Sequence, residues 1–211
     1  MKNPQSTSQP DPIGRRSFLK LGAGVALGVP LLAAASGCAV EDPLAAQAKA
    51  GDNKNYIAGD GSVTEYAAEA RGAAVQFEGT LFDGTAVSAT EFAGNVVVLN
   101  FWYAACAPCR KEAPDLVELH DQFASEGARF YGVNIRDERN TAEAFERSFK
   151  IPYPSFQDKD GGILLAMTQF VPPSAVPTTL VLDREGRVAA RILGLADKST
   201  LKALISDALA A

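Results

Sequence analysis

Two cysteines separated by two residues, Cys106 and Cys109, are the side chains of this sequence with the clearest capacity for chemistry. Two thiols at this spacing can close and open a disulfide by exchange with another molecule. Cys106 directly precedes a predicted helix, where unpaired N–H groups and the helix dipole stabilise an anion, so we expect its thiolate to attack. Cys109, one turn into the helix, then resolves the mixed disulfide. The spacing therefore predicts a redox-active dithiol.

A structural disulfide or half of a zinc site is the alternative for these two cysteines. Zinc needs two further ligands, and the sequence offers Cys38 and His120. Cys38 falls in a predicted export signal. His120 lies in the same predicted helix as Cys109, eleven residues further along the chain. We therefore expect no metal site here.

The elements that position the dithiol are a buried strand and the helix after it. Residues 96–102 are apolar apart from Asn100, which is typical of a central strand. Pro108 suits a first helical turn, and helical spacing follows it. One helix face carries Cys109, Glu112, Leu116, Leu119 and Phe123, at intervals of 3, 4, 3 and 4 residues.

Glu112 consequently points inward, beside the dithiol. Burial raises the pKa of a carboxyl group, so Glu112 could hold a proton near neutral pH and exchange it with the sulfurs. The alternative is a structural Glu whose carboxylate reaches water.

Three stretches carry a resemblance to a known family: residues 100–114, residues 176–179 and the predicted turn at 183–186. Together they resemble the thioredoxin superfamily, most closely its membrane-tethered TlpA/ResA-like branch, over roughly residues 73–211. The resemblance implies Cys106 as nucleophile, Cys109 as resolving thiol and Pro177 as a cis-proline beside them. It also implies that Trp102, Ala105 and Val176 border the substrate.

The sequence departs from thioredoxin itself at two places near the dithiol. Asn100 stands where thioredoxins carry a buried Asp, and Glu112 matches the acid of the TlpA-like branch. Ala105 replaces the Trp that usually precedes the first cysteine, which changes the surface offered to a partner.

The pattern of the remaining chain predicts an α/β fold: a mixed, thioredoxin-like sheet with helices on both faces and an N-terminal β-hairpin. The expected strands cover residues 75–80, 85–87, 96–102, 128–134, 153–156, 178–183 and 187–193, and the expected helices cover about 107–126, 141–149, 163–170 and 201–209.

The N-terminal sequence indicates export. Residues 14–20, with Arg15 and Arg16, resemble a twin-arginine signal, and the apolar stretch 21–35 is too short to span a bilayer. Residues 35–38 resemble a lipobox ending at Cys38, the predicted lipidation site; ordinary cleavage near residues 33–35 is the alternative. We expect a lipoprotein signal peptide at 1–37, a flexible tether at 38–72 and one domain at 73–211.

These observations predict an extracytoplasmic, lipid-anchored thiol-disulfide oxidoreductase without a cofactor. The resemblance implies reduction of exported proteins, such as apocytochrome c, with electrons from a membrane redox donor; oxidation of exported thiols is the alternative. The net charge of −5, with no concentrated basic face, argues against nucleic acid.

Two other classes of protein fit the sequence less well. A copper-carrying module would need a His near the dithiol, and His120 lies eleven residues after Cys109. A peroxiredoxin would need a Thr where Tyr103 stands.

Overall fold

The structure is a computed structural model that describes residues 59–211. The predicted signal peptide, Cys38 and most of the predicted tether lie outside the described residues.

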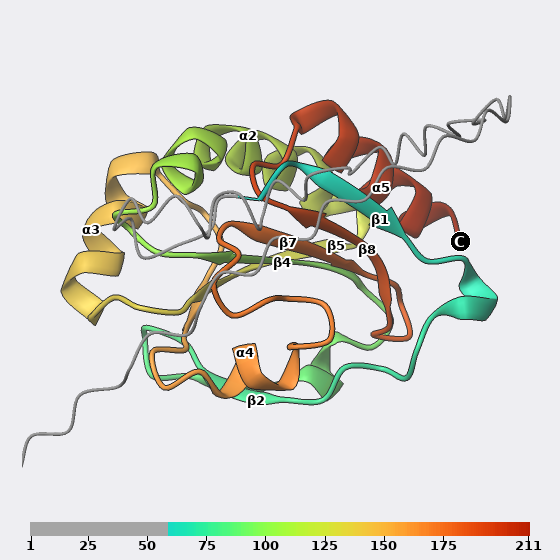
Figure 1. Cartoon of the computed structure of the whole chain (residues 1–211), viewed down its shortest axis with the longest axis horizontal. Coiled ribbons are helices and arrows are strands. Elements are labelled where there is room, and N and C mark those ends of the chain that lie inside the picture. The colour runs from blue at the N-terminus through green and yellow to red at the C-terminus, as the bar shows by residue number, and fades with distance from the viewer. Residues whose placement is uncertain (1–58) are drawn as a thin grey trace, which may run out of the picture. The chain divides into compact units, whose positions relative to one another are not determined.

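A six-stranded mixed sheet forms the centre of the described part, in the order β1-β8-β7-β4-β5-β6 (Figure 1). Its strands are β1 (Ser62–Glu65), β4 (Val96–Trp102), β5 (Ala128–Asn134), β6 (Ser155–Gln157), β7 (Thr178–Leu182) and β8 (Val188–Leu193). β4 is parallel to β5 and antiparallel to β7. All residues of β4 are buried, because layers cover both faces of the sheet.

Helices and a hairpin form these two layers (Figure 1). α2 (Ala107–Phe123) and α5 (Lys198–Ala210) pack on one face, and α3 (Arg139–Phe149) packs beside the start of α2. α4 (Gly162–Ala166) and the hairpin of β2 (Glu78–Thr80) and β3 (Ala86–Ser88) cover the other face. Short 3-10 turns follow β1 at Ala68–Ala70, β3 at Ala89–Phe92 and α2 at Ala124–Glu126.

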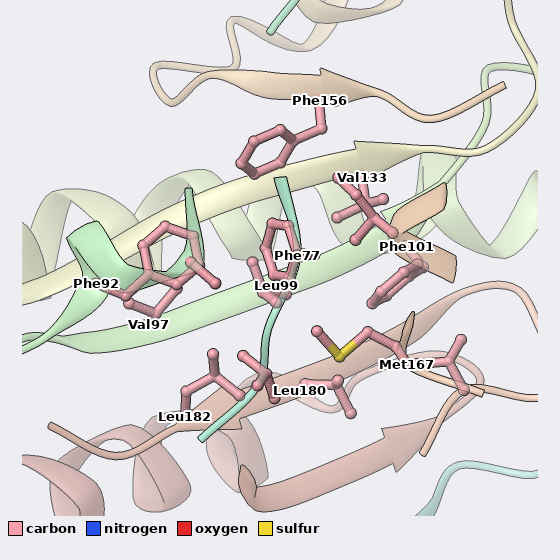
Figure 2. Packing of buried hydrophobic residues seen from close by; sticks show 14 of the residues in the cluster. Phe77, Phe92, Val97, Leu99, Phe101, Val133, Phe156, Met167, Leu180 and Leu182 are labelled. Atoms are coloured by element: carbon pink, nitrogen blue, oxygen red, sulfur yellow. The ribbon is translucent and has the colours of Figure 1, made fainter. Parts of the chain in front are cut away.

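Alternation along β4 decides which side chains meet which layer. Val97, Leu99 and Phe101 enter the core beneath the hairpin and α4, where Figure 2 shows them among Phe77, Phe156 and Met167. Residues 96 and 98 pack under α2 and α5 instead. Asn100 follows the same alternation and therefore faces α2, the helix that carries the dithiol.

The predicted architecture is confirmed: the fold is α/β, with a mixed sheet, helices on both faces and an N-terminal hairpin. β4 and β5 have the predicted bounds, 96–102 and 128–134. The predicted helix at 163–170 is shorter, since α4 ends at Ala166 and Met167 is already buried in the core.

One element was not predicted: β1 lies within the segment expected to be a tether. It pairs antiparallel with β8 through backbone hydrogen bonds, and its side chains are mostly exposed. Because an edge strand of this kind needs no apolar alternation, its sequence carries no strong signal. The folded unit therefore begins before residue 73.

Among residues 59–211, no helix combines the length and the apolar character that crossing a membrane requires.

Candidate active site

The two predicted cysteines form a disulfide at the start of α2. The Cys106 and Cys109 sulfurs are 2.11 Å apart. Cys106 is the N-cap residue of α2, and its Sγ accepts a hydrogen bond from the Cys109 backbone N–H at 3.2 Å. This contact, together with the helix dipole, would stabilise a thiolate at Cys106 after reduction.

Both sulfur-bearing residues are buried in this disulfide form. Cys106 is 0% exposed and Cys109 is 3% exposed. Ala105, which precedes Cys106, is exposed. The residue next to the dithiol on the surface is therefore Ala105.

Glu112 lies on the inner face of α2, as its spacing predicted, and is 1% exposed. Its Oε1 accepts a hydrogen bond from Asn100 Nδ2 at 2.8 Å, and its Oε2 accepts one from the Ala196 backbone N–H at 2.9 Å. Asn100 Nδ2 also donates to Thr179 Oγ1 on β7, at 3.1 Å. The carboxyl group of Glu112 is thus held by a side chain from β4 and by a backbone group from the loop before α5. A side chain of β7 holds Asn100 in turn.

Burial raises the pKa of Glu112 to about 8, although the hydrogen bonds from Ala196 and Asn100 favour the ionised form. Nearby Asp115 raises it further. The predicted inward position of Glu112 is what the structure shows, and the raised pKa agrees with a carboxyl group that holds a proton near neutral pH. An uncharged Glu112 places no negative charge beside a thiolate.

The bond between Val176 and Pro177 is cis, as the resemblance implied. Val176 belongs to the same buried cluster as Cys106 and Cys109, so the structure brings this loop to the dithiol although it lies about 70 residues away in sequence. The Pro177 carbonyl accepts a hydrogen bond from the Gly194 N–H at 2.8 Å, which ties the loop to the end of β8.

Trp102, predicted to border the substrate, is only 4% exposed. Its ring packs on Phe145 of α3, with centroids 4.4 Å apart. In the disulfide form the indole therefore fills the interior beside the dithiol, and Ala105 is the predicted border residue that faces outward.

The loop before Cys106 is held by residues that the sequence did not indicate. The Ala104 N–H donates to Asp137 Oδ2 at 2.6 Å, and the Ala104 carbonyl accepts from Arg110 Nη1 at 3.3 Å. Asn134 Nδ2 donates to the same Asp137 oxygen at 2.9 Å. Asp137 lies in the turn between β5 and α3, where nothing in its sequence marks a contact with a segment 33 residues earlier.

Metal-ligating side chains do not gather in the described part of the chain: residues 59–211 contain no cluster of three or more His, Cys, Asp or Glu side chains suited to an ion. His120 instead packs against the rings of Phe130 and Tyr153, and its Nδ1 lies 3.1 Å from Asp121 Oδ1.

A mixed sheet with this topology and a dithiol at the start of the helix after its central strand define a protein of the thioredoxin fold. The AhpC/TSA family profile matches residues 71–191. The chain belongs to the AhpC/TSA family, because the match covers more than half of it.

Sequence relatives include proteins named thiol-disulfide oxidoreductase ResA. The protein of Geobacillus thermodenitrificans is 32% identical over 113 residues, which are 54% of this chain and 63% of that protein. The protein of Bacillus subtilis is 29% identical over 119 residues, 56% of this chain and 64% of that protein. This chain thus spans slightly less than two thirds of each.

Solved structures with the same fold include two from Corynebacterium. A DsbF homologue from Corynebacterium diphtheriae is 33% identical with a TM-score of 0.62, over 71% of this chain and 94% of that one. A secreted thiol-disulfide isomerase from Corynebacterium glutamicum is 29% identical with a TM-score of 0.64, over 72% of this chain and 95% of that one.

Proposed function

We propose that this protein is a thiol-disulfide oxidoreductase that exchanges disulfides with other proteins through Cys106 and Cys109. The observation that carries the proposal is the disulfide at the N-terminus of α2, with the cis Val176–Pro177 bond and buried Glu112 close by. The names of the relatives from Geobacillus and Bacillus support the same reaction.

The reaction has two exchange steps. In the reducing direction, the Cys106 thiolate attacks a partner disulfide, forms a mixed disulfide and releases one partner thiolate. Cys109 then loses its proton and attacks Cys106 Sγ. The bond between Cys106 and the partner breaks, the second partner thiolate leaves, and the internal disulfide closes. The partner gains two electrons and this protein loses them.

The other site residues support this exchange. Neutral Glu112 keeps negative charge away from the sulfurs below about pH 8. The Val176 backbone, beside Pro177, would pair with a partner segment, and Ala105 leaves that approach unobstructed where a Trp would project.

Trapping of mixed disulfides tests the assignment of the two thiols. Cys109→Ser should accumulate adducts through Cys106, because the resolving thiol is gone, whereas Cys106→Ser should accumulate few. Both variants and the wild type would be compared by non-reducing electrophoresis and mass spectrometry. Equal trapping by the two variants contradicts the roles, and a wild type that fails to reduce any model disulfide contradicts the function.

The proposed direction is reduction of exported proteins with paired cysteines, such as apocytochrome c, with electrons from a membrane donor. The reduction potential of the Cys106/Cys109 pair, measured against glutathione, tests this direction. A potential well below that of glutathione supports a reductant. A potential well above it supports the alternative, an oxidant of exported thiols.

The proposed location is the outer face of the cell membrane. Residues 1–37 would act as the export signal, Cys38 would carry the lipid, and the chain from Cys38 to the start of β1 would be the tether. The word "secreted" in the name of the Corynebacterium glutamicum structure supports export.

Substitution of the lipidation site tests the anchor. The wild type should partition with membranes through its lipid, because two acyl chains bind a bilayer stably, and Cys38→Ala should block this processing. Membrane fractionation and N-terminal sequencing provide the measurement. A soluble wild type with an N-terminus other than Cys38 is incompatible with lipidation.

A further inference from the structure

A small cavity lies beside the resolving thiol, between β4, α2, α3 and the chain entering β6. Its volume open to the centre of a water molecule is about 10 Å³, roughly that of one water. Asn100, Cys109, Tyr153 and Ser155 are polar or sulfur-bearing residues of its lining, and the remaining lining residues are largely apolar. A site of this size with several polar groups suits a single ordered water.

Two buried polar atoms near this cavity lack a hydrogen-bond partner among the described residues: Ser155 Oγ, whose residue lines the cavity, and Glu146 Oε1, whose residue lies outside the lining but interacts with Ser155. Ser155 lines the cavity and is 3% exposed. Glu146, on α3, lies close enough for the Ser155 hydroxyl to favour its ionised form. Because unpartnered buried polar atoms are costly, both atoms are suited to hydrogen bonds with a bound water or with each other.

Glu146 also extends this polar path outward. Unlike Glu112, it is only half-buried, so it can exchange protons with solvent. Burial raises the pKa of Glu146, and Ser155 opposes that rise. The path therefore runs from Cys109 through the cavity to Ser155 and Glu146.

The resolving step needs a group, other than Glu112, that accepts the proton of the Cys109 thiol. Cys109 must lose a proton while buried, and Glu112 has a pKa of about 8, so at pH 7 most Glu112 side chains already carry a proton. Glu112 cannot then take up a second one.

Other charged and titratable groups surround the path. Asp115 of α2 raises the pKa of Glu112, and Glu143 and Arg147 of α3 act on Glu146 in opposite directions. Tyr153 stays protonated, because burial raises its pKa and both Glu112 and Glu146 raise it further. His120 of α2 contacts the far side of the Tyr153 ring.

We propose that Ser155 and Glu146, together with one water in the cavity, carry the proton of the Cys109 thiol to solvent during the resolving step. This inference rests on the proposed function. The Cys109 S–H bond breaks and its proton passes to the water, which passes one of its own to Ser155 Oγ. The Ser155 hydroxyl proton moves to the Glu146 carboxylate, which releases it to solvent. The Cys109 thiolate then attacks Cys106 Sγ, and the partner leaves as a thiolate.

Rapid-quench kinetics of the full chain can separate this step from the first one. Reduced protein would be mixed with glutathione disulfide between pH 5 and 9, quenched in acid and analysed by mass spectrometry. Appearance of the Cys106–glutathione adduct reports the first attack, and its decay reports the resolving step. The variants are Glu146→Gln and Ser155→Ala, and Glu138→Gln is the control: it makes the same charge change at the exposed N-cap of α3, and Glu138 is not among the charges that act on Glu146.

Both variants should slow adduct decay about tenfold or more, a modest loss for proton transfer, while adduct formation stays at the wild-type rate. The decay rate of Glu146→Gln should also lose the rise with pH that accompanies ionisation of Glu146. Decay rates equal to those of Glu138→Gln at every pH would overturn the proposal. Failure of the wild type to form the Cys106–Cys109 disulfide with glutathione disulfide would instead contradict the proposed function.

The circular dichroism spectrum of each variant shows whether it is folded. If Ser155→Ala does not fold, Glu146→Gln decides alone, because its half-buried side chain is replaced by one of equal size.

Discussion

At the scale of single residues, the Glu112 carboxyl group is a buried acid one helical turn beyond Cys109. It is 1% exposed and receives hydrogen bonds from Asn100 and from the Ala196 backbone. Those two bonds favour its charge, yet desolvation outweighs them and raises the pKa to about 8. The protein therefore keeps a mostly neutral acid beside its dithiol at pH 7.

The raised pKa predicts a pH-dependent stability that Glu112→Gln removes. The pKa of Glu112 is about 8 in the folded disulfide form against 4.5 as the ordinary value. Between these values the folded state holds a proton that the unfolded state has lost, so the contribution of this group to stability is complete below the lower value and declines as pH rises to about 8.

Urea unfolding of the oxidised wild type and of Glu112→Gln at pH 4, 6 and 8 measures this effect. The free energy of unfolding of the wild type should fall relative to the variant as pH rises, by at most about 5 kcal/mol. A constant difference between the two proteins across this range would show that Glu112 titrates normally.

Glu112→Gln should also change the titration of the thiols. Below about pH 8 the neutral Gln resembles protonated Glu112, so the reaction of Cys106 with a small alkylating agent should differ little. Above that pH, ionised Glu112 opposes thiolate formation in the wild type, and the variant should react faster. Identical alkylation profiles from pH 5 to 9 would leave Glu112 with a structural role only.

At the scale of elements, the turn between β5 and α3 holds the loop between β4 and α2. Asp137 accepts hydrogen bonds from the Ala104 N–H and from Asn134, and Arg110 donates to the Ala104 carbonyl from the other side. Both polar groups of the Ala104 peptide are thus occupied. This arrangement fixes the residues that lead into Cys106 and supports its burial.

Loss of this anchor should expose the disulfide. Asp137→Ala should lower the free energy of unfolding by about 1 to 3 kcal/mol and should increase the rate at which a phosphine reduces the Cys106–Cys109 bond. Asp137→Asn keeps an acceptor oxygen, so its free energy of unfolding and its reduction rate should lie between those of the wild type and those of Asp137→Ala. Glu138→Ala is the matched control, because its ion pair with Lys159 is exposed and contributes little. A reduction rate equal to that control would mean that the loop keeps its position without Asp137.

At the scale of the whole described unit, β1 completes the sheet from a part of the sequence with no apolar pattern. It covers the outer edge of β8, which would otherwise offer unpaired backbone groups. The chain enters β1 past a close backbone contact: a Cβ placed on Gly59 would lie 2.3 Å from the Gly194 backbone N. Glycine is therefore required at this approach.

Gly59→Ala tests how much this edge contributes. The substitution should lower the denaturation midpoint and speed hydrogen exchange in β1 and along β8, because backbone atoms must move to admit the methyl group. Gly72→Ala is the control, since a Cβ there meets nothing within 4 Å. Comparable stability of the two variants would indicate that the Gly59 contact relaxes without cost.

The sequence by itself determined the dithiol, its place between a buried strand and a helix, the inward direction of Glu112 and the α/β class. These properties depend on local patterns: a continuous apolar run along residues 96–102, a Pro in the first helical turn, and intervals of three and four residues on the face of Cys109 and Glu112. Family resemblance added the cis bond before Pro177, which local propensity does not predict.

Only the tertiary structure decided which distant groups meet. The Ala196 N–H, Thr179 and Asp137 reach the site through backbone or short side-chain contacts across 33 to 84 residues of sequence, and such contacts leave no periodic pattern. The cavity with Ser155 and Glu146 likewise exists only where α2, α3 and β6 converge. The degree of burial, and with it the pKa of Glu112, depends on all surrounding layers together, so a helical period could predict its direction but not its extent.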